Sequence, residues 1–170
     1  MRMMFFILFT FLFDRVLFSQ ANSADGVTTV TICTEMKKNC IGGQILINKI
    51  IGIEDTTIVK LQGFITDIKG KSIAFTMIKF TNIQTREKHL IMSDYTGKYR
   101  IVLDSGKYTF KFSSFGYRDF LIDEIVFKYG QISEINIDMG EYCCLKTELQ
   151  KIQNKDLETP IKEFEKRKVK

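Results

Sequence analysis

The sequence predicts an all-β protein built around one seven-stranded antiparallel β-sandwich, with a short helical extension at its C-terminus. Between residues 58 and 140, apolar and polar residues alternate in short runs, a period of two that is typical of strands with one buried face. Turn-forming residues separate these runs about every ten residues, which favours a sandwich over a parallel sheet. Beyond residue 145 the apolar residues change to a helical spacing.

Each predicted strand is recognised by alternate side chains that share a face. The sets are, in chain order, Leu61, Gly63 and Ile65; Ile78 and Phe80; Leu90 and Met92; Tyr99, Ile101 and Leu103; and Tyr108, Phe110 and Phe112. Runs at 120–127 and 132–139 complete the seven strands. Residues 104–106 are predicted to form a tight hairpin connection, so that Tyr99 and Phe110 lie on one face of two adjacent strands.

Residues 145–168 are predicted to form two short helices. Two apolar triads, each spaced i, i+4, i+7, support them: Leu145, Leu149 and Ile152, then Leu157, Ile161 and Phe164. Thr159 before Pro160 is a suitable N-cap for the second helix. A frayed tail is the alternative for the last ten residues.

The formal charge of +5 is concentrated in this tail. From Leu145 onward the sequence holds seven lysines and Arg167 against five acidic residues. No cluster of stacking aromatics accompanies these basic residues. The tail is therefore expected to be a solvated segment and not a nucleic-acid site.

The segment 1–21 is expected to be a signal peptide. Arg2 gives it a positive start, and residues 3–13 form an uncharged apolar run, which is shorter than the roughly 20 residues that span a membrane. Small residues allow cleavage after Ser19 or after Ala21. The alternative is that the segment stays as a membrane anchor, which would bury the acidic and basic residues that follow the run.

Residues 59–139 resemble the carboxypeptidase regulatory-like domain, a transthyretin-like seven-stranded β-sandwich. The motifs that carry the resemblance are Leu61-Gln-Gly63-Phe-Ile65-Thr-Asp67-Ile-Lys-Gly70, Ser93-Asp94-Tyr-Thr-Gly97-Lys-Tyr99, Gly106-Lys-Tyr108 and Gly116-Tyr117. Ser72 and Thr76 depart from the family, which usually has proline and alanine there. The resemblance implies a non-catalytic module of the kind found beside peptidases and at the start of outer-membrane transporters.

The chemistry of these motif residues independently predicts scaffold roles. Glycines in turns reach positive φ without steric cost, and Asp67 and Asp94 can accept hydrogen bonds from the turn backbone two residues on. Tyr108 can fill the edge of the core while its hydroxyl ties down a nearby loop. A ligand site is the alternative. The residues given structural roles are Gly63, Asp67, Gly70, Asp94, Gly97, Tyr99, Gly106, Tyr108, Gly116 and Tyr117.

No catalytic residue, cofactor or metal site is expected. His89 is the one histidine of the chain, and one histidine cannot build a typical catalytic zinc site. Transthyretin-like 5-hydroxyisourate hydrolases carry more than one active-site histidine, so the resemblance does not extend to their activity. P-loop, dinucleotide and Gly-x-Ser-x-Gly motifs do not occur. A calcium cluster of Asp94, Asp104 and Asp123 is an alternative that their separate turns disfavour.

The four cysteines lie outside the predicted strands, as Cys33 and Cys40 before them and Cys143 and Cys144 after them. Export would permit disulfides, so at least one is expected to join the first pair to the second. The apolar stretch 41–53 could bring the chain ends together by covering a sheet edge. The connectivity stays open, and a zinc site with these four ligands is the alternative.

These features divide the chain into a signal peptide (1–21), a lead-in segment (22–57), a carboxypeptidase regulatory-like sandwich (58–140) and a helical, basic extension (141–170). The expected function is a non-enzymatic, exported module with a binding or structural role in the cell envelope, either periplasmic or extracellular. Its expected partner is an envelope protein or glycan, with no nucleic acid and no stable membrane span after signal removal. One alternative is a periplasmic accessory subunit of a membrane transport or assembly complex, docking through the C-terminal helices. A small transthyretin-like hydrolase is the other.

Overall fold

The computed structural model describes residues 19–24 and 27–153, with side chains described within residues 31–148. The described residues form strands and contain no helix, which confirms the all-β prediction. They belong to two compact units. The sandwich unit is Lys37–Cys143, and the ribbon unit combines Met1–Met36 with Cys144–Lys170.

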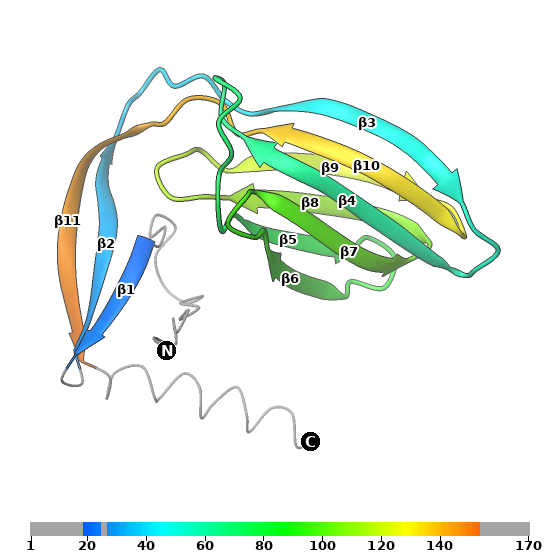
Figure 1. Ribbon diagram of the computed structural model, residues 1–170, viewed down its shortest axis with the longest axis horizontal. Helices are drawn as coiled ribbons and strands as arrows, with labels where there is room; N and C mark the ends of the chain where they lie inside the picture. Colours follow the sequence, from blue (N-terminus) through cyan, green and yellow to red (C-terminus); the bar gives the residue numbers. More distant parts are fainter. Residues whose placement is uncertain (1–18, 25–26, 154–170) are drawn as a thin grey trace. The chain divides into compact units, whose positions relative to one another are not determined.

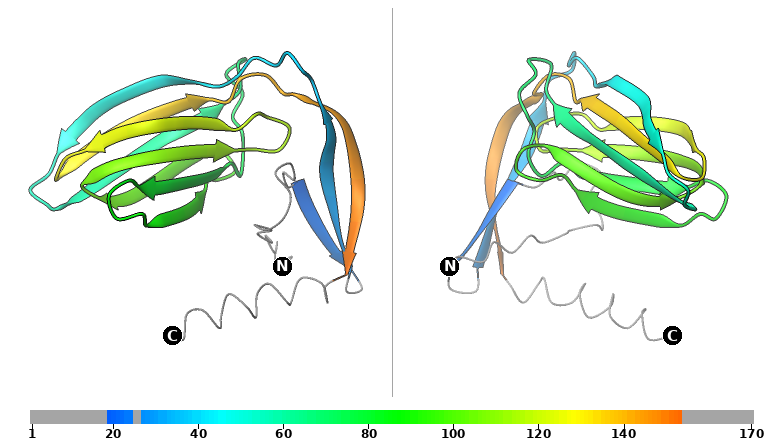
Figure 2. Two further views of the ribbon diagram at one scale, coloured as in Figure 1. Left: turned by 180° about the vertical axis from the view of Figure 1, so that it is seen from behind. Right: turned by 45° about the vertical axis from the view of Figure 1, so that its right-hand side comes forward.

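The sandwich unit consists of two four-stranded sheets, which form the two layers seen in Figure 1 and in both views of Figure 2. The first sheet has the order β3 (Gln44–Ile53), β10 (Gln131–Asp138), β4 (Ile58–Thr66) and β7 (Lys98–Asp104). The second has the order β6 (Lys88–Met92), β5 (Met77–Asn82), β8 (Gly106–Ser113) and β9 (Phe120–Phe127).

Alternation along the strands places one face of each sheet in a common core. In β4, Val59, Leu61, Gly63 and Ile65 are buried, while the residues that alternate with them are exposed or half-buried. In β8, Tyr108, Phe110 and Phe112 are buried in the same way. Phe110 packs against Phe80 and Phe127 with ring centroids 5.8 and 6.2 Å apart. These three rings all belong to the second sheet, and the apolar contact of its inner face with the inner face of the first sheet is the main driving force that holds the two layers together.

The prediction of adjacent strands across residues 104–106 is wrong. β7 pairs with β4 in the first sheet, whereas β8 pairs with β5 and β9 in the second. The short turn therefore carries the chain from one layer to the other. Tyr99 and Phe112 still meet in the core, with ring centroids 6.0 Å apart, because they approach it from opposite sheets. Alternation predicts which side chains of a strand are buried, but it does not predict the neighbouring strand. Two strands of one hairpin and two strands of facing sheets show the same alternation.

Two further expectations about the sandwich need correction. The sheets are not wholly antiparallel, because β10 runs parallel to β4. Leu90 and Met92 share a face of β6, but it is the outer face. Register places Ile91 opposite the buried Ile78, and Ile91 packs against the core.

The lead-in contributes an eighth strand to the sandwich. Seven strands, β4 to β10, lie between residues 58 and 140 as predicted. β3 precedes them and pairs antiparallel with β10 along the edge of the first sheet. The apolar stretch at 41–53 thus covers a strand that would otherwise be exposed.

The ribbon unit is a three-stranded sheet in the order β1 (Ser19–Ala24), β2 (Val27–Met36) and β11 (Cys144–Gln153). The prediction of a first helix beginning at Leu145 is wrong, because these residues belong to strand β11. Leu145 and Leu149 are spaced i, i+4, which suits either a helix or one face of a strand. These residues form a strand because they pair in a long antiparallel ladder with β2, which is rich in β-branched residues.

Other expectations fall on residues that the structure does not describe. The second predicted helix, with Thr159 and Pro160, lies outside the described residues, as do residues 1–18 of the predicted signal peptide. The predicted cleavage points, Ser19 and Ala21, fall within β1. Within 19–24 and 27–153, no helix is long and apolar enough to cross a membrane.

Candidate functional site

The two predicted Asp-x-x-Gly turns are built by carboxylates that bind the backbone. Asp94 Oδ1 accepts hydrogen bonds from the Thr96 hydroxyl (2.7 Å) and from the backbone N–H groups of Thr96 (2.8 Å) and Lys98 (3.0 Å). The Thr96 hydroxyl is the largest contribution to an Asp94 pKa below its usual value. Asp67 Oδ1 accepts from the backbone N–H groups of Lys69 (2.9 Å) and Lys71 (2.8 Å). Both carboxylates are therefore occupied by their own turns.

Gly97 closes the second turn at a position that excludes a side chain. Its φ is +77°, and a Cβ would lie 2.6 Å from the carbonyl oxygen of Ile65. β4, the strand that contains Ile65, is held against this turn by a hydrogen bond from the Ile65 N–H to the Gly97 carbonyl (2.9 Å). Glycine is the residue that reaches this conformation without strain.

The side chain of Tyr99 in β7 reaches over Gly63, its partner in β4, to the point where the ladder between β4 and β10 is interrupted. The ladder pairs Gln62 with Glu134 and resumes at Ile65 with Ile137. In the gap, the buried Tyr99 hydroxyl donates to the carbonyl oxygen of Ile135 (2.7 Å). Burial raises the Tyr99 pKa well above its usual value, so the hydroxyl remains a donor.

Gly63 provides the space for this arrangement. A Cβ at Gly63 would collide with the Ile135 carbonyl and would lie 2.9 Å from the Tyr99 hydroxyl oxygen. Next to it, the Asn136 side-chain oxygen accepts the backbone N–H of Phe64 (2.9 Å). Side chains thus replace the missing backbone pairs, which keeps the buried polar groups satisfied.

The remaining motif residues lie near chain reversals. The Tyr108 hydroxyl donates to the Asp104 carbonyl (3.1 Å), across the turn that joins the two sheets. Tyr117 meets Tyr142 edge to face, with ring centroids 5.5 Å apart. Burial is the largest cause of its raised pKa. The three other glycines of the motifs, Gly70, Gly106 and Gly116, have φ of +76°, +153° and +80°.

His89 lies on the rim of the second sheet and has two partners. Its ring stacks on Phe80, opposite it in the ladder, with centroids 5.1 Å apart. Its Nε2 lies 3.1 Å from a carboxylate oxygen of Glu87. The part of the chain that the structure describes contains no second histidine with which it could share a metal or relay a proton.

The four cysteines form two disulfides, Cys33–Cys144 and Cys40–Cys143, each with Cα atoms 5.9 Å apart. This confirms the predicted joining of the early pair to the late pair, and the structure supplies the connectivity. The first bond lies within the ribbon unit and the second within the sandwich unit. Sulfurs held in disulfides are not thiolates, so the structure does not support the zinc alternative.

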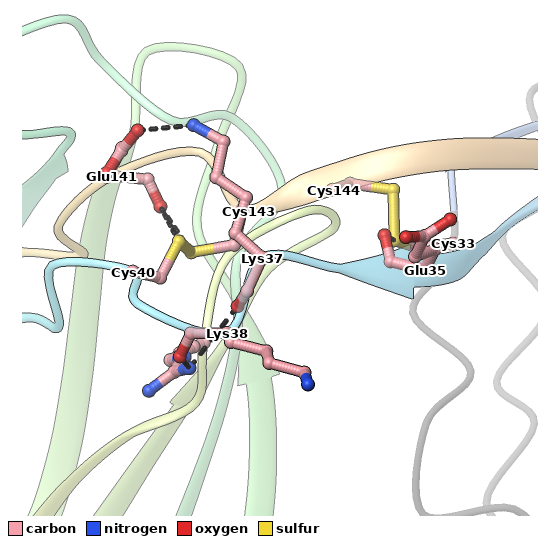
Figure 3. The surroundings of a disulfide bond; sticks show 9 residues. Cys33, Glu35, Lys37, Lys38, Cys40, Glu141, Cys143 and Cys144 are labelled. Atoms are coloured by element: carbon pink, nitrogen blue, oxygen red, sulfur yellow. Dashed lines mark hydrogen bonds and ion pairs between the residues drawn. A yellow bond between two sulfur atoms is a disulfide. The ribbon is translucent and has the colours of Figure 1, made fainter.

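Polar contacts surround the Cys40–Cys143 disulfide (Figure 3). Lys37 forms an ion pair with Glu141, and this contact lowers the Glu141 pKa. The backbone N–H of Lys37 also donates to the Cys143 carbonyl (2.9 Å). Arg118 donates from its guanidinium to the Lys38 carbonyl. The contacts of Lys37 tie the first residues of the sandwich unit to its last ones, and Arg118 ties them to the loop between β8 and β9.

Sequence comparison identifies the domain that carries these turns. The family model of the carboxypeptidase regulatory-like domain matches residues 60–140. This segment is a carboxypeptidase regulatory-like domain. The match confirms the resemblance carried by the glycine, aspartate and tyrosine motifs. No curated protein matches the sequence.

Solved structures resemble the chain only remotely. A catechol 1,2-dioxygenase of Acinetobacter radioresistens is 10% identical, with a TM-score of 0.42 over 51% of this chain and 53% of that chain. A chlorocatechol 1,2-dioxygenase of Pseudomonas putida is 9% identical, with a TM-score of 0.43 over 55% of this chain and 64% of that chain. This chain thus spans less than two thirds of either enzyme. Similarity at this level carries no argument about activity.

The carboxypeptidase regulatory-like domain has a shallow depression beside the second turn. It has a volume of about 390 Å³ and is lined by Met92, Asp94, Lys98, Tyr99 and Arg100. Asp94 and Tyr99 are the polar groups already engaged by the backbone. Across the described ranges 19–24 and 27–153, no three His, Cys, Asp or Glu side chains are placed to hold a metal ion. Asp94, Asp104 and Asp123 are therefore not brought together as a calcium cluster.

One surface feature was not singled out from the sequence as a site. The edge strand β3 of the sandwich unit's first sheet carries large apolar side chains that remain exposed. Its sequence, Gln44-Ile-Leu-Ile-Asn-Lys-Ile-Ile-Gly-Ile53, contains one charged residue and runs of adjacent apolar ones. The lack of strict alternation is the signal that could have indicated an edge exposed on both faces.

Proposed function

We propose that this chain is an exported, non-enzymatic β-sandwich module with a binding or structural role in the cell envelope. The observation that carries the proposal is the use of the motif residues. Asp67 and Asp94 cap their own turns, and the Tyr99 and Tyr108 hydroxyls bind backbone carbonyls. Because these groups support the fold, we assign the binding or structural role to the remaining surface of the domain.

The two disulfides support the location outside the reducing cytosol, in the periplasm or beyond the cell. Disulfides persist in such oxidising compartments and are rare in the cytosol. The partner we propose is a protein or glycan of the envelope. Docking through a helix at 145–152 is not part of the proposal, because these residues form β11.

N-terminal sequencing and thiol alkylation of chain isolated from an envelope fraction test the export. We expect the mature chain to begin at Gln20 or Asn22 and to contain no thiol that reacts before reduction. Retention of Met1 together with four reactive thiols would contradict export. Cleavage at either site would leave β2 and β11 intact, since both follow it in the sequence.

The non-enzymatic role is tested with the His89→Ala variant. His89 is the one histidine of the chain, and its partners are Phe80 and Glu87. We expect the wild-type chain to hydrolyse no ester, amide or ureide substrate above the buffer rate, and the variant to behave identically. Turnover by the wild type that His89→Ala abolishes would show a hydrolase. Glu87→Ala serves as a control that removes the ion pair and keeps the imidazole.

A further inference from the structure

The two sheets of the sandwich unit have four edge strands, which are β3 and β7 in the first sheet and β6 and β9 in the second. Natural proteins protect such edges with charges, with short strands or with coverage. β9 presents the exposed Asp123 and Glu124, and β7 carries Lys98, Arg100 and Asp104. β6 has only five residues. β3 has ten residues and a single charged one, Lys49.

β3 also exposes five large apolar side chains. They are Ile45 (38%), Leu46 (52%), Ile50 (59%), Ile51 (43%) and Ile53 (79%). Ile45, Ile50 and Ile53 are paired with Ile137, Ser133 and Gln131 of β10, all of which are buried. The second sheet thus covers the inner face of β10 but leaves the same face of β3 uncovered. Leu46 and Ile51 are the residues skipped where the register shifts.

The charge on β3 is compensated within the same sheet. Lys49 Nζ lies 3.4 Å from Glu134 Oε2 on the outer face. The edge is therefore apolar and electrically neutral. A partner strand selected by charge would place its charges against isoleucine, which is unfavourable. A second copy of β3 presents the same neutral, apolar character and leaves no charge unmatched.

We propose that two copies of this chain pair antiparallel through β3, about a two-fold axis that passes between their Asn48 residues. Residues opposite each other in an antiparallel pair share a face, so the axis must pass through a residue position. An axis at Lys49 would oppose two like charges. An axis at Asn48 pairs Ile47 with the other copy's Lys49, within the regular stretch between the two register shifts. The Lys49 charge opposite Ile47 is already matched by Glu134 of its own sheet. It also brings Ile50 to the other copy's Ile45 and Leu46.

Sedimentation equilibrium of the oxidised full chain, from about 1 μM to about 1 mM, measures the pairing in the range of weak to moderate affinity. We expect a reversible monomer–dimer equilibrium that Ile50→Lys weakens at least tenfold. Val102→Lys is the matched control, because Val102 is 66% exposed on β7, the opposite edge of the same sheet. It should dimerise as the wild type does. A wild type that is monomeric throughout, or an Ile50→Lys variant that dimerises normally, would overturn the proposal.

Cysteine crosslinking tests the axis without relying on a disruptive substitution. Directly opposed residues have Cβ atoms about 4.5–5.5 Å apart, which is close enough for a disulfide after small adjustments. Asn48→Cys should therefore form a covalent dimer by itself. Ile47→Cys and Lys49→Cys should crosslink mainly when mixed with each other. Peptide mapping confirms that the two native disulfides persist. A dimer in which Asn48→Cys does not crosslink would refute this axis.

Discussion

The two units of the molecule are stabilised by different means. The sandwich unit buries a continuous apolar core between two sheets, in which Phe110, Phe112 and Leu61 are among the largest fully buried side chains. In the ribbon unit, none of the side chains described at 31–36 and 144–148 is buried. Its strands are held by the ladder of β2 with β11 and by the Cys33–Cys144 bond. A core can stabilise one fold cooperatively, whereas a single sheet needs a crosslink or a partner.

The largest difference between the units should follow from removing part of the core. Phe110→Ala should lower the free energy of unfolding by about 3–5 kcal/mol, because it removes a fully buried ring and leaves a cavity. Urea denaturation followed by tyrosine fluorescence measures the loss. Val102→Ala, on an exposed position of β7, should change the value by less than about 0.5 kcal/mol. A loss below about 1 kcal/mol for Phe110→Ala would contradict a core centred on β8.

Removing the disulfides one at a time should separate the two units. Cys40→Ser with Cys143→Ser should destabilise the sandwich by about 2–4 kcal/mol, the usual effect of losing a native crosslink. Cys33→Ser with Cys144→Ser should leave the sandwich within about 1 kcal/mol of the wild type, because the sandwich keeps its own crosslink.

Hydrogen exchange followed by mass spectrometry shows where the second pair of substitutions acts. Amides of β2 and β11 should exchange faster in Cys33→Ser with Cys144→Ser, and those of β4 and β8 should not. If both pairs of substitutions destabilise the sandwich equally, the two units unfold together and the comparison fails.

A smaller effect is expected from the hydrogen bond that joins Tyr99 of β7 to Ile135 of β10, at the interruption of the ladder between β4 and β10. Tyr99→Phe should lower the free energy of unfolding by about 1–3 kcal/mol, because the buried Ile135 carbonyl loses its hydrogen-bond donor while the ring still packs. Tyr95→Phe is the control, because Tyr95 is exposed in the second turn. Urea denaturation of both variants gives the difference. Equal stabilities would mean that the hydroxyl group contributes nothing at the interrupted ladder.

The smallest expected effect is on the stability of the folded chain at acidic pH. The pKa of Asp94 is lowered in the folded chain from the unperturbed value of 3.8. Its contribution to stability is therefore fully present above about pH 4 and is lost as the pH falls through the lowered pKa. Asp94→Asn should flatten the dependence of stability on pH below about 4. Denaturation curves between about pH 2 and 6 measure the slopes.

The sequence alone determined much of the sandwich. Alternation and turn residues located the strands from β4 to β10, and the spacing of glycine, aspartate and tyrosine identified the family. These signals are local, because each depends on residues within one strand or one turn. The joining of the early cysteines to the late ones was also predicted, since Cys143 and Cys144 are adjacent and cannot easily bond each other.

Only the tertiary structure decided which elements became neighbours. Leu145 and Leu149 fit a helix as well as a strand, and pairing with β2 selected the strand. A short turn after Asp104 fits a hairpin or a change of sheet, and the ladders of β7 with β4 and of β8 with β5 selected the change. The exposed edge of β3 also depends on where the second sheet ends. Alternation indicates that a strand has a buried face, but the partner that covers this face comes from distant parts of the chain.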